Sequence, residues 1–310
     1  MKLKYKILSG IVIILIISIL SIIFLMTYNQ LSFKKYLGEQ SIKQSNSILN
    51  EIDREIKEKL DESKFHGESL IIIEELKKSN EYFENISDRE NYIDNIDNLW
   101  INNKSEIQEI INNIISNKGS VRLNDINEFY TKQEDFTVYH EIFVTNKYGV
   151  VVSSTGITSD YRQNDENWWK ESFENEIYFE EPLYDVSSNE TGFIIAHKLY
   201  NENGEFIGII KEILSLKKIK DIIEEASMIE EDSNESDELE IKLLTKNGST
   251  IYQSENTLYE IKDFSKFNFF KKLINKQGYL IITEEWDLED SDEKYSFHIQ
   301  NHPDIKNLLD

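Results

Sequence analysis

Residues 141–152 read EIFVTNKYGVVV, and this stretch decides the fold. Val, Ile and Phe at its two ends are typical of strands, and the Asn and Gly in its middle, at 146–149, favour a tight turn. The same pattern begins again further along the chain, where residues 240–248 read EIKLLTKNG. Two strand–turn–strand units of one kind predict two related subdomains.

The remainder of the first unit predicts an antiparallel sheet. A short helix is expected at 168–173 and strands at 177–184, 192–200 and 206–214, with a hairpin turn at 201–204. Two strands, a helix and three further strands are typical of a small α+β domain with helices on one side of an antiparallel sheet.

The second unit is shorter than the first. A helix is expected at 264–274 and strands at 279–286 and 294–300, but nothing corresponds to the closing strand at 206–214. The second subdomain is therefore expected either to be incomplete in this chain or to end differently from the first.

The N-terminus predicts a transmembrane helix. Residues 7–26 form an almost unbroken apolar run that is long enough to cross a bilayer. Lys2, Lys4 and Lys6 would also suit a cleaved signal peptide, but the run is longer than a usual signal-peptide core and no small-residue cleavage site follows it. We therefore expect an uncleaved anchor, with the three lysines in the cytoplasm and the bulk of the chain outside the cell.

A long helical stalk is expected next, from residue 31 to about residue 81. Apolar residues recur there at helical spacing, and Gly67 is the expected interruption. One interpretation is a helix that packs on its own domain; the other is a stalk that also pairs with a second copy, giving a homodimer. The pattern remains helical through 87–135.

Composition excludes several classes of protein. The 310 residues include 34 Lys and Arg against 58 Asp and Glu, a net charge of −24, which opposes binding to nucleic acid. There is no Cys, so disulfides and thiolate metal sites are excluded. The chain lacks a phosphate-binding Gly loop, a G-x-S-x-G elbow and an H-E-x-x-H motif, and its five His are scattered. We expect no catalytic residues, no metal and no cofactor.

Three stretches, 143–152, 159–169 and 181–185, together with the hairpin strand ending at 206–210, carry a resemblance to a known family. With the membrane anchor and long helix, the chain resembles the double Cache sensor domains, tandem PAS-like sheets of bacterial and archaeal histidine kinases, chemoreceptors and cyclases. The resemblance implies that the membrane-distal sheet binds a small extracellular ligand. It also implies that the long helix carries the signal inward.

The resemblance also implies roles for particular residues. Trp168 and Trp169 match the paired aromatics that begin the pocket helix, and Asp185 matches the acidic residue that holds a ligand amine. Amino-acid-binding members place an Arg two residues before the first aromatic, whereas this chain has Glu166 there. That departure argues against an ordinary amino-acid ligand.

The residue types of this region indicate a ligand class independently. The aromatic candidates for the walls of a pocket are Tyr161, Trp168, Trp169, Tyr178 and Tyr184, and the acidic candidates are Asp160, Asp165, Glu166 and Asp185. Such a mixture suits an amine or cationic ligand. Arg162 is the exception: it either binds an anionic group or pairs with a neighbouring carboxylate. Because adjacent residues on a helix point in different directions, the two Trp are not expected to share one core, and we expect at least one of them to border a cleft or to cover the rim of the sheet.

The sequence therefore predicts six parts, with a cytoplasmic tail at 1–6 and a transmembrane helix at 7–28. The others are helices at 29–135, a distal subdomain at 136–220, an acidic linker at 221–240 and a proximal subdomain at 241–310. The predicted function is extracellular small-molecule sensing, and a working receptor would need a second membrane helix and an output region after Asp310. The alternative is a membrane-anchored protein-binding or structural module whose aromatic residues form only its core.

Overall fold

A computed structural model describes residues 2–185, 190–228, 241–245, 247–253, 263–267, 270–271, 279–282 and 297–300. The chain divides into two units, Met1–Glu51 with Asp263–Asp310, and Ile52–Lys262. The expected boundaries of the six parts remain predictions.

The chain begins with one long helix, α1 (Lys2–Gly67). Near its N-terminus α1 is long and apolar enough to cross a membrane, with a mean hydropathy of 3.0 and no burial in its most apolar window. It ends at Gly67, the interruption predicted from the sequence. A Cβ at Gly67 would lie 2.4 Å from Cδ2 of Leu199 and 3.0 Å from Cγ2 of Ile210, so glycine lets the end of the helix approach the sheet.

Shorter helices follow within the unit Ile52–Lys262. They are α2 (Leu70–Glu84), α3 (Arg89–Asn102), the 3-10 helix η1 (Lys104–Ile107), α4 (Gln108–Ser116) and α5 (Lys118–Glu134). At the start of α5, the Asn117 side chain accepts a hydrogen bond of 2.9 Å from the backbone N–H of Ser120, which caps the helix.

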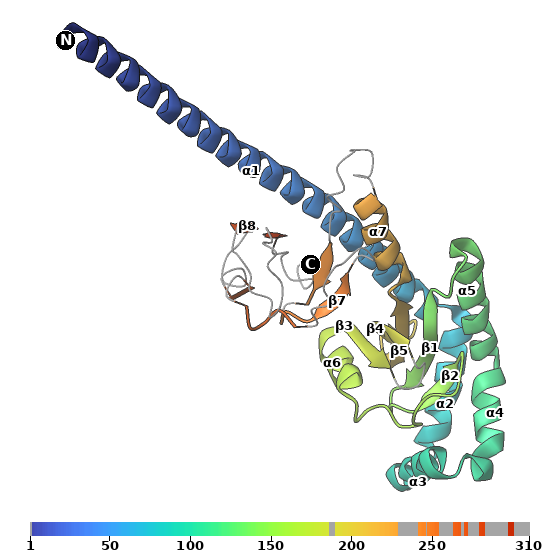
Figure 1. The fold of residues 1–310 in the computed structure, drawn as a ribbon. Coiled ribbons are helices and arrows are strands. Elements are labelled where there is room, and N and C mark those ends of the chain that lie inside the picture. The colour runs from blue at the N-terminus through green and yellow to red at the C-terminus, as the bar shows by residue number, and fades with distance from the viewer. Residues whose placement is uncertain are drawn as a thin grey trace. The chain divides into compact units, whose positions relative to one another are not determined.

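The predicted antiparallel sheet is present in this unit (Figure 1). Its strands are β1 (Tyr139–Asn146), β2 (Val151–Ser154), β3 (Ile177–Asp185), β4 (Glu190–Tyr200) and β5 (Phe206–Ser215), and α6 (Asn167–Asn175) lies between β2 and β3 in sequence. The spatial order is β2-β1-β5-β4-β3 and every pair is antiparallel. The α+β class is confirmed.

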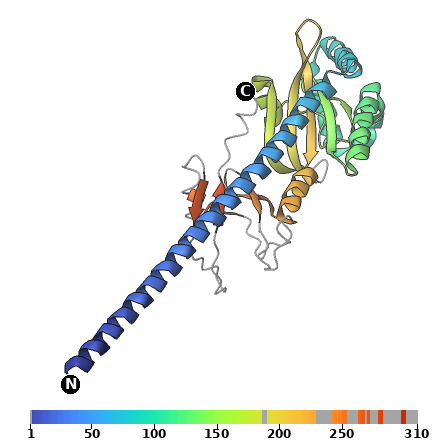
Figure 2. The ribbon, with the colours of Figure 1, turned by 90° about the horizontal axis from the view of Figure 1, so that it is seen from above.

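Helices cover both faces of this sheet, whereas the sequence predicted helices on one side. Helix α6 packs on one face, and the last turns of α1, together with α2, pack on the other (Figure 2). Nearly every residue of β1 and β5 is buried, so these central strands need cover on both faces, as strands with continuous apolar runs do.

The repeated turn is also present. β6 (Lys242–Leu244) and β7 (Thr250–Gln253) pair as β1 and β2 do. Gly149 and Gly248 have φ of 80° and 91°, and each donates its N–H to the carbonyl three residues earlier. A positive φ explains why both turns carry glycine. Helix α7 (Lys217–Met228) follows β5 and occupies the start of the expected linker, while the remainder of that linker lies outside the described residues.

In the unit that contains Met1–Glu51, β8 (Tyr279–Ile282) and β9 (Phe297–Gln300) form a two-stranded antiparallel sheet. These strands fall within the two ranges predicted for the second subdomain. Of the expected helix at 264–274, residues 270–271 are helical and residues 264–267 are not, while 268–269 and 272–274 lie outside the described residues.

Candidate ligand-binding face

The sheet face that α6 covers, called the α6 face below, carries the two predicted tryptophans. Trp168 is 5% exposed and its ring meets that of Phe143 edge-on, with centroids 5.7 Å apart. Trp169 is 8% exposed, its Nε1 donates to Oγ1 of Thr145 over 3.0 Å, and its ring stacks on Phe173. Both belong to one buried cluster with residues of β1, β4 and β5.

The expectation that the two adjacent tryptophans cannot share one core is wrong, because both are buried in that single cluster. Trp168 points toward Phe143 near the middle of the sheet. Trp169 is covered on its other side by Phe173 and by Phe206, which begins β5. The two rings share one core because Trp168 packs on Phe143 of the sheet while Phe173 and Phe206 cover Trp169.

A buried lysine lies beside these rings. Lys211 of β5 is 6% exposed, and its Nζ is 5.1 Å from the ring centroid of Trp168 and 5.3 Å from that of Phe143. In the sheet it lies opposite Phe143 of β1 and Ala196 of β4. Contacts of this kind between a cation and aromatic rings are strongest where water is excluded.

Glu141 accompanies Lys211 on the α6 face. It is 4% exposed and lies two residues before Phe143 on β1, which places it diagonally across from Lys211 and within reach of a long side chain. Both residues have interaction partners. Sequence reasoning missed this pair, although a Lys between Ile210 and Glu212 in an apolar strand was a signal that could have found it.

Tyr161 joins the same buried cluster from the loop after β2. It is 5% exposed and stacks on Trp100 of α3, with ring centroids 5.6 Å apart and planes at 29°. The backbone N–H groups of Tyr161 and Arg162 both donate to Oδ1 of Asp97, each over 2.9 Å. Helix α3 thus fixes the loop that approaches α6.

Arg162 pairs with neighbouring carboxylates, which was one of the two expectations for it. Its guanidinium lies 3.1 Å from Glu90 and 2.5 Å from Asp94, both on α3, and its Nε donates to Oδ1 of Asn164. Ion pairs with α3 therefore hold the Arg162 side chain.

Among the acidic candidates, Asp160 has a displaced pKa. Burial raises the pKa of this carboxyl to about 6, against the hydrogen bonds from Ser159 and Gln163 that lower it. A carboxyl that titrates near neutral pH next to an aromatic cluster is a candidate for a functional group. Tyr184 and Asp185 pair in β3 with Thr191 and Glu190 of β4, and their side chains lie outside the described ones.

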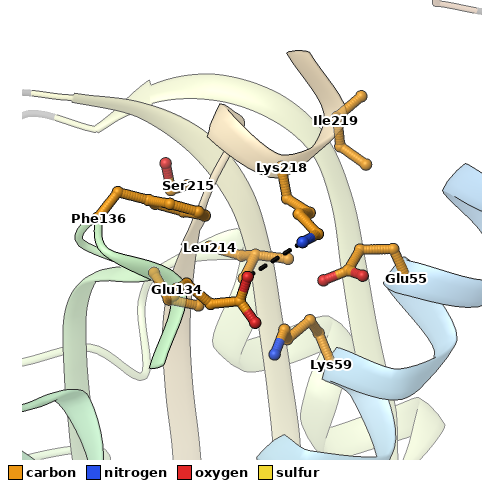
Figure 3. Close-up of a pocket in the computed structure, with 9 residues that line it drawn as sticks. Glu55, Lys59, Glu134, Phe136, Leu214, Ser215, Lys218 and Ile219 are labelled. Atoms are coloured by element: carbon orange, nitrogen blue, oxygen red, sulfur yellow. Dashed lines mark hydrogen bonds and ion pairs between the residues drawn. The ribbon is translucent and has the colours of Figure 1, made fainter. Parts of the chain in front are cut away.

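A small cavity lies on the opposite side of the sheet, between α1, the end of α5, the end of β5 and the start of α7 (Figure 3). It is lined by Glu55 and Lys59 of α1 and by Glu134, which bonds to Lys218 over 3.0 Å. Its volume is about 10 Å³, room for a single water molecule. Among the described residues, no three His, Asp or Glu side chains come together in a way that could hold a metal ion.

No family model and no curated protein matches the chain. Among solved structures, it is similar to an extracellular ligand-binding receptor from Desulfohalobium retbaense, with 16% identity over 63% of this chain and 33% of that one, and a TM-score of 0.39. The chain thus spans a third of that receptor. It is also similar to the sensor domain of the Vibrio cholerae histidine kinase DctB, with 12% identity over 83% of this chain and 94% of that one, and a TM-score of 0.38.

A third similar structure is the ligand-binding domain of the Campylobacter jejuni chemoreceptor Tlp3 in complex with 4-methylisoleucine. The identity is 9% over 76% of this chain and 82% of that one, with a TM-score of 0.36. All three are sensor or ligand-binding domains of receptors or kinases, the class that the sequence resembles. The three TM-scores are below 0.5 and the identities are below 25%. The ligand and the output of this chain are therefore inferred from its own residues.

Proposed function

We propose that this chain is the extracellular sensing part of a membrane-anchored receptor and that it binds a small molecule on the α6 face. The observation that carries the proposal is the buried ammonium of Lys211, set against the rings of Trp168 and Phe143 beneath a short helix. Moving a charge out of water costs free energy that its partners offset only in part, so a buried lysine is retained more readily where it serves recognition.

The ligand we propose carries an anionic group. The ammonium of Lys211 would form a charge-assisted hydrogen bond with a carboxylate or phosphate, and it would oppose a purely cationic ligand. The amine predicted from the sequence remains compatible, because Glu141 and Asp160 supply negative charge on the same side of the sheet. A molecule that bears both groups fits the charges of this face better than an amine alone.

The membrane anchor supports the sensing part of the proposal. Helix α1 continues without interruption from its apolar N-terminal part to the turn at Gly67, where it meets the sheet. A ligand that shifts the sheet would act directly on the helix that continues into the anchor.

The test is a thermal-shift screen of the full chain in detergent micelles against amino acids, amines, carboxylates and nucleobases. The affinity of the best ligand is then measured by calorimetry for Lys211→Met and for a matched control, Lys220→Met. Lys220 also lies over an aromatic ring, 5.5 Å from the centroid of Tyr252, but on α7. We expect Lys211→Met to weaken binding about tenfold or more and the control to leave it unchanged. Equal affinity in the two variants contradicts the proposed site.

A second candidate is the protein-binding or structural module, and the burial of Trp168, Trp169 and Tyr161 favours it. Aromatic residues that only fill a core need no ligand. This function is favoured if no compound in the screen stabilises the chain while the double variant Glu141→Leu with Lys211→Met, which replaces both buried charges by apolar side chains, keeps or raises its melting temperature.

A further inference from the structure

The contact between α1 and the sheet contains a histidine with an unusual environment. His197 of β4 is 3% exposed, and its Nε2 has no hydrogen-bond partner. Its imidazole forms a hydrogen bond with the backbone of Leu60 in α1. Because Nε2 has no partner, Nδ1 is the ring nitrogen that makes this bond. On the sheet it lies opposite Ile177 and Ile210, so its neighbours there are apolar.

The charged groups around His197 come from each element that packs on it. Helix α1 supplies Asp61 and Lys64, which favour and oppose a positive charge on the ring respectively. Strand β5 supplies Glu212, which is fully buried and whose Oε1 is 2.8 Å from Nδ1 of His66, near the end of α1. Strand β3 offers only the apolar Ile177 directly opposite the ring.

Farther out, four titratable groups complete this contact. Tyr130 of α5 lies 3.4 Å from Nε2 of His66, and Tyr139 of β1 donates its hydroxyl to Glu62 of α1 over 3.3 Å. Lys59 pairs with Glu62 over 2.8 Å. The polar groups between α1 and the sheet thus largely bond to one another; among the described residues, Nε2 of His197 lacks a partner there, as do Oγ of Ser63 and Oε2 of Glu212.

Protonation of His197 is disfavoured while α1 is in place. Burial lowers the pKa of His197 to about 4, and Lys64 lowers it further, against the opposing effects of Leu60 and Asp61. An exposed histidine titrates near 6.5. Any state in which the end of α1 has moved away from β4, and water reaches the ring, therefore binds a proton that the packed state rejects.

We propose that His197 makes the contact between α1 and the sheet sensitive to external pH, so that acidification loosens the end of α1 from β4. Protonation of His197 would then act on α1 at the face of the sheet that lies opposite the α6 face, where the ligand is proposed to bind. This gives the chain a second input that does not depend on any ligand.

The test is hydrogen–deuterium exchange of the full chain in lipid nanodiscs between pH 7 and pH 4.5, read at the backbone amides of residues 58–66 and corrected for intrinsic exchange rates. We expect the open fraction of this segment to rise by up to about tenfold for each pH unit below about 6.5. Amides in the centres of β1 and β5 should keep their protection. Equal loss of protection in helix and strands would indicate global unfolding and overturn the proposal.

Three variants make the result specific. His197→Asn keeps a donor near the position of Nδ1 but cannot titrate, so the pH dependence should disappear. His140→Gln, in β1, removes a histidine elsewhere in the sheet and should leave it unchanged. Lys64→Gln changes an exposed side chain, so the variant will fold. It removes a positive charge that lowers the pKa of His197, so this pKa rises. As the pH falls, the loss of protection should therefore level off at a higher pH than in the parent. An identical pH dependence in the parent, His197→Asn and Lys64→Gln overturns the proposal.

Discussion

The indole of Trp169 shows how a single hydrogen bond fixes helix α6 on the sheet. Its Nε1 donates to Oγ1 of Thr145 on β1 inside the buried cluster. We expect Trp169→Phe to lower the free energy of unfolding by about 1 kcal/mol beyond the loss of ring area, since Thr145 then loses its donor. A double-mutant cycle with Thr145→Val, measured by urea unfolding, isolates this contribution. A coupling energy near zero would show that the bond does not stabilise α6.

A second residue makes stability depend on pH. The pKa of Asp160 is raised to about 6 by burial, so the folded chain holds a proton there that the unfolded chain has released. This carboxyl therefore contributes stability below about pH 4 that is lost as the pH rises through about 6. Asn keeps an oxygen that can accept from Ser159 and Gln163. We expect Asp160→Asn to be more stable than the parent by about 2 kcal/mol at pH 7 and equal to it below pH 4. A difference that does not change with pH would contradict the assigned cause.

The candidate site was predictable where it depends on local pattern. The sequence predicted a short helix at 168–173 that carries the two adjacent tryptophans, and that helix is α6; it did not predict that both rings share one core. The position of Lys211 was not predictable, because the register that sets it opposite Phe143 depends on pairing between strands far apart in sequence. The same holds for Arg162, whose carboxylate partners lie on α3, about seventy residues earlier.

At the scale of elements, close approach of β5 to β1 depends on a glycine. A Cβ at Gly208 would lie 2.1 Å from the backbone oxygen of Thr145, so one strand must move to accept it. We expect Gly208→Ala to lower the free energy of unfolding by about 3 kcal/mol. Gly156→Ala is the matched control, because nothing lies within 4 Å of a Cβ there, and it should change stability by less than about 0.5 kcal/mol. Similar costs for the two variants would contradict the close approach.

Most elements of the first subdomain follow from the sequence. Local sequence patterns of two to ten residues predicted the strands of the hairpin, the turn at Gly149 and the break at Gly67. What the sequence did not predict is that helices cover both faces of the sheet. Period-two alternation is weak in β1 and β5, and a strand buried on both faces can be recognised only once its neighbours on each side are known.

At the scale of the whole molecule, the orientation in the membrane is testable because the chain has no cysteine. Lys4→Cys and Asn203→Cys each place a single exposed thiol, on the N-terminal segment and in the β4–β5 turn. We expect a membrane-impermeant maleimide to label Asn203→Cys in intact cells, and to label Lys4→Cys only after lysis. The reverse pattern would place the sheet in the cytoplasm.

The central claim is that a small molecule binds on the α6 face, and indole resonances report on it most directly. The full chain, labelled with ¹⁵N at tryptophan and held in micelles, is titrated with the strongest ligand from the screen. We predict that the Nε1–H resonances of Trp168 and Trp169 shift in proportion to occupancy and further than that of Trp100, whose Nε1 donates to the backbone of Thr158. Saturated binding with the Trp168 and Trp169 resonances unmoved would contradict the claim.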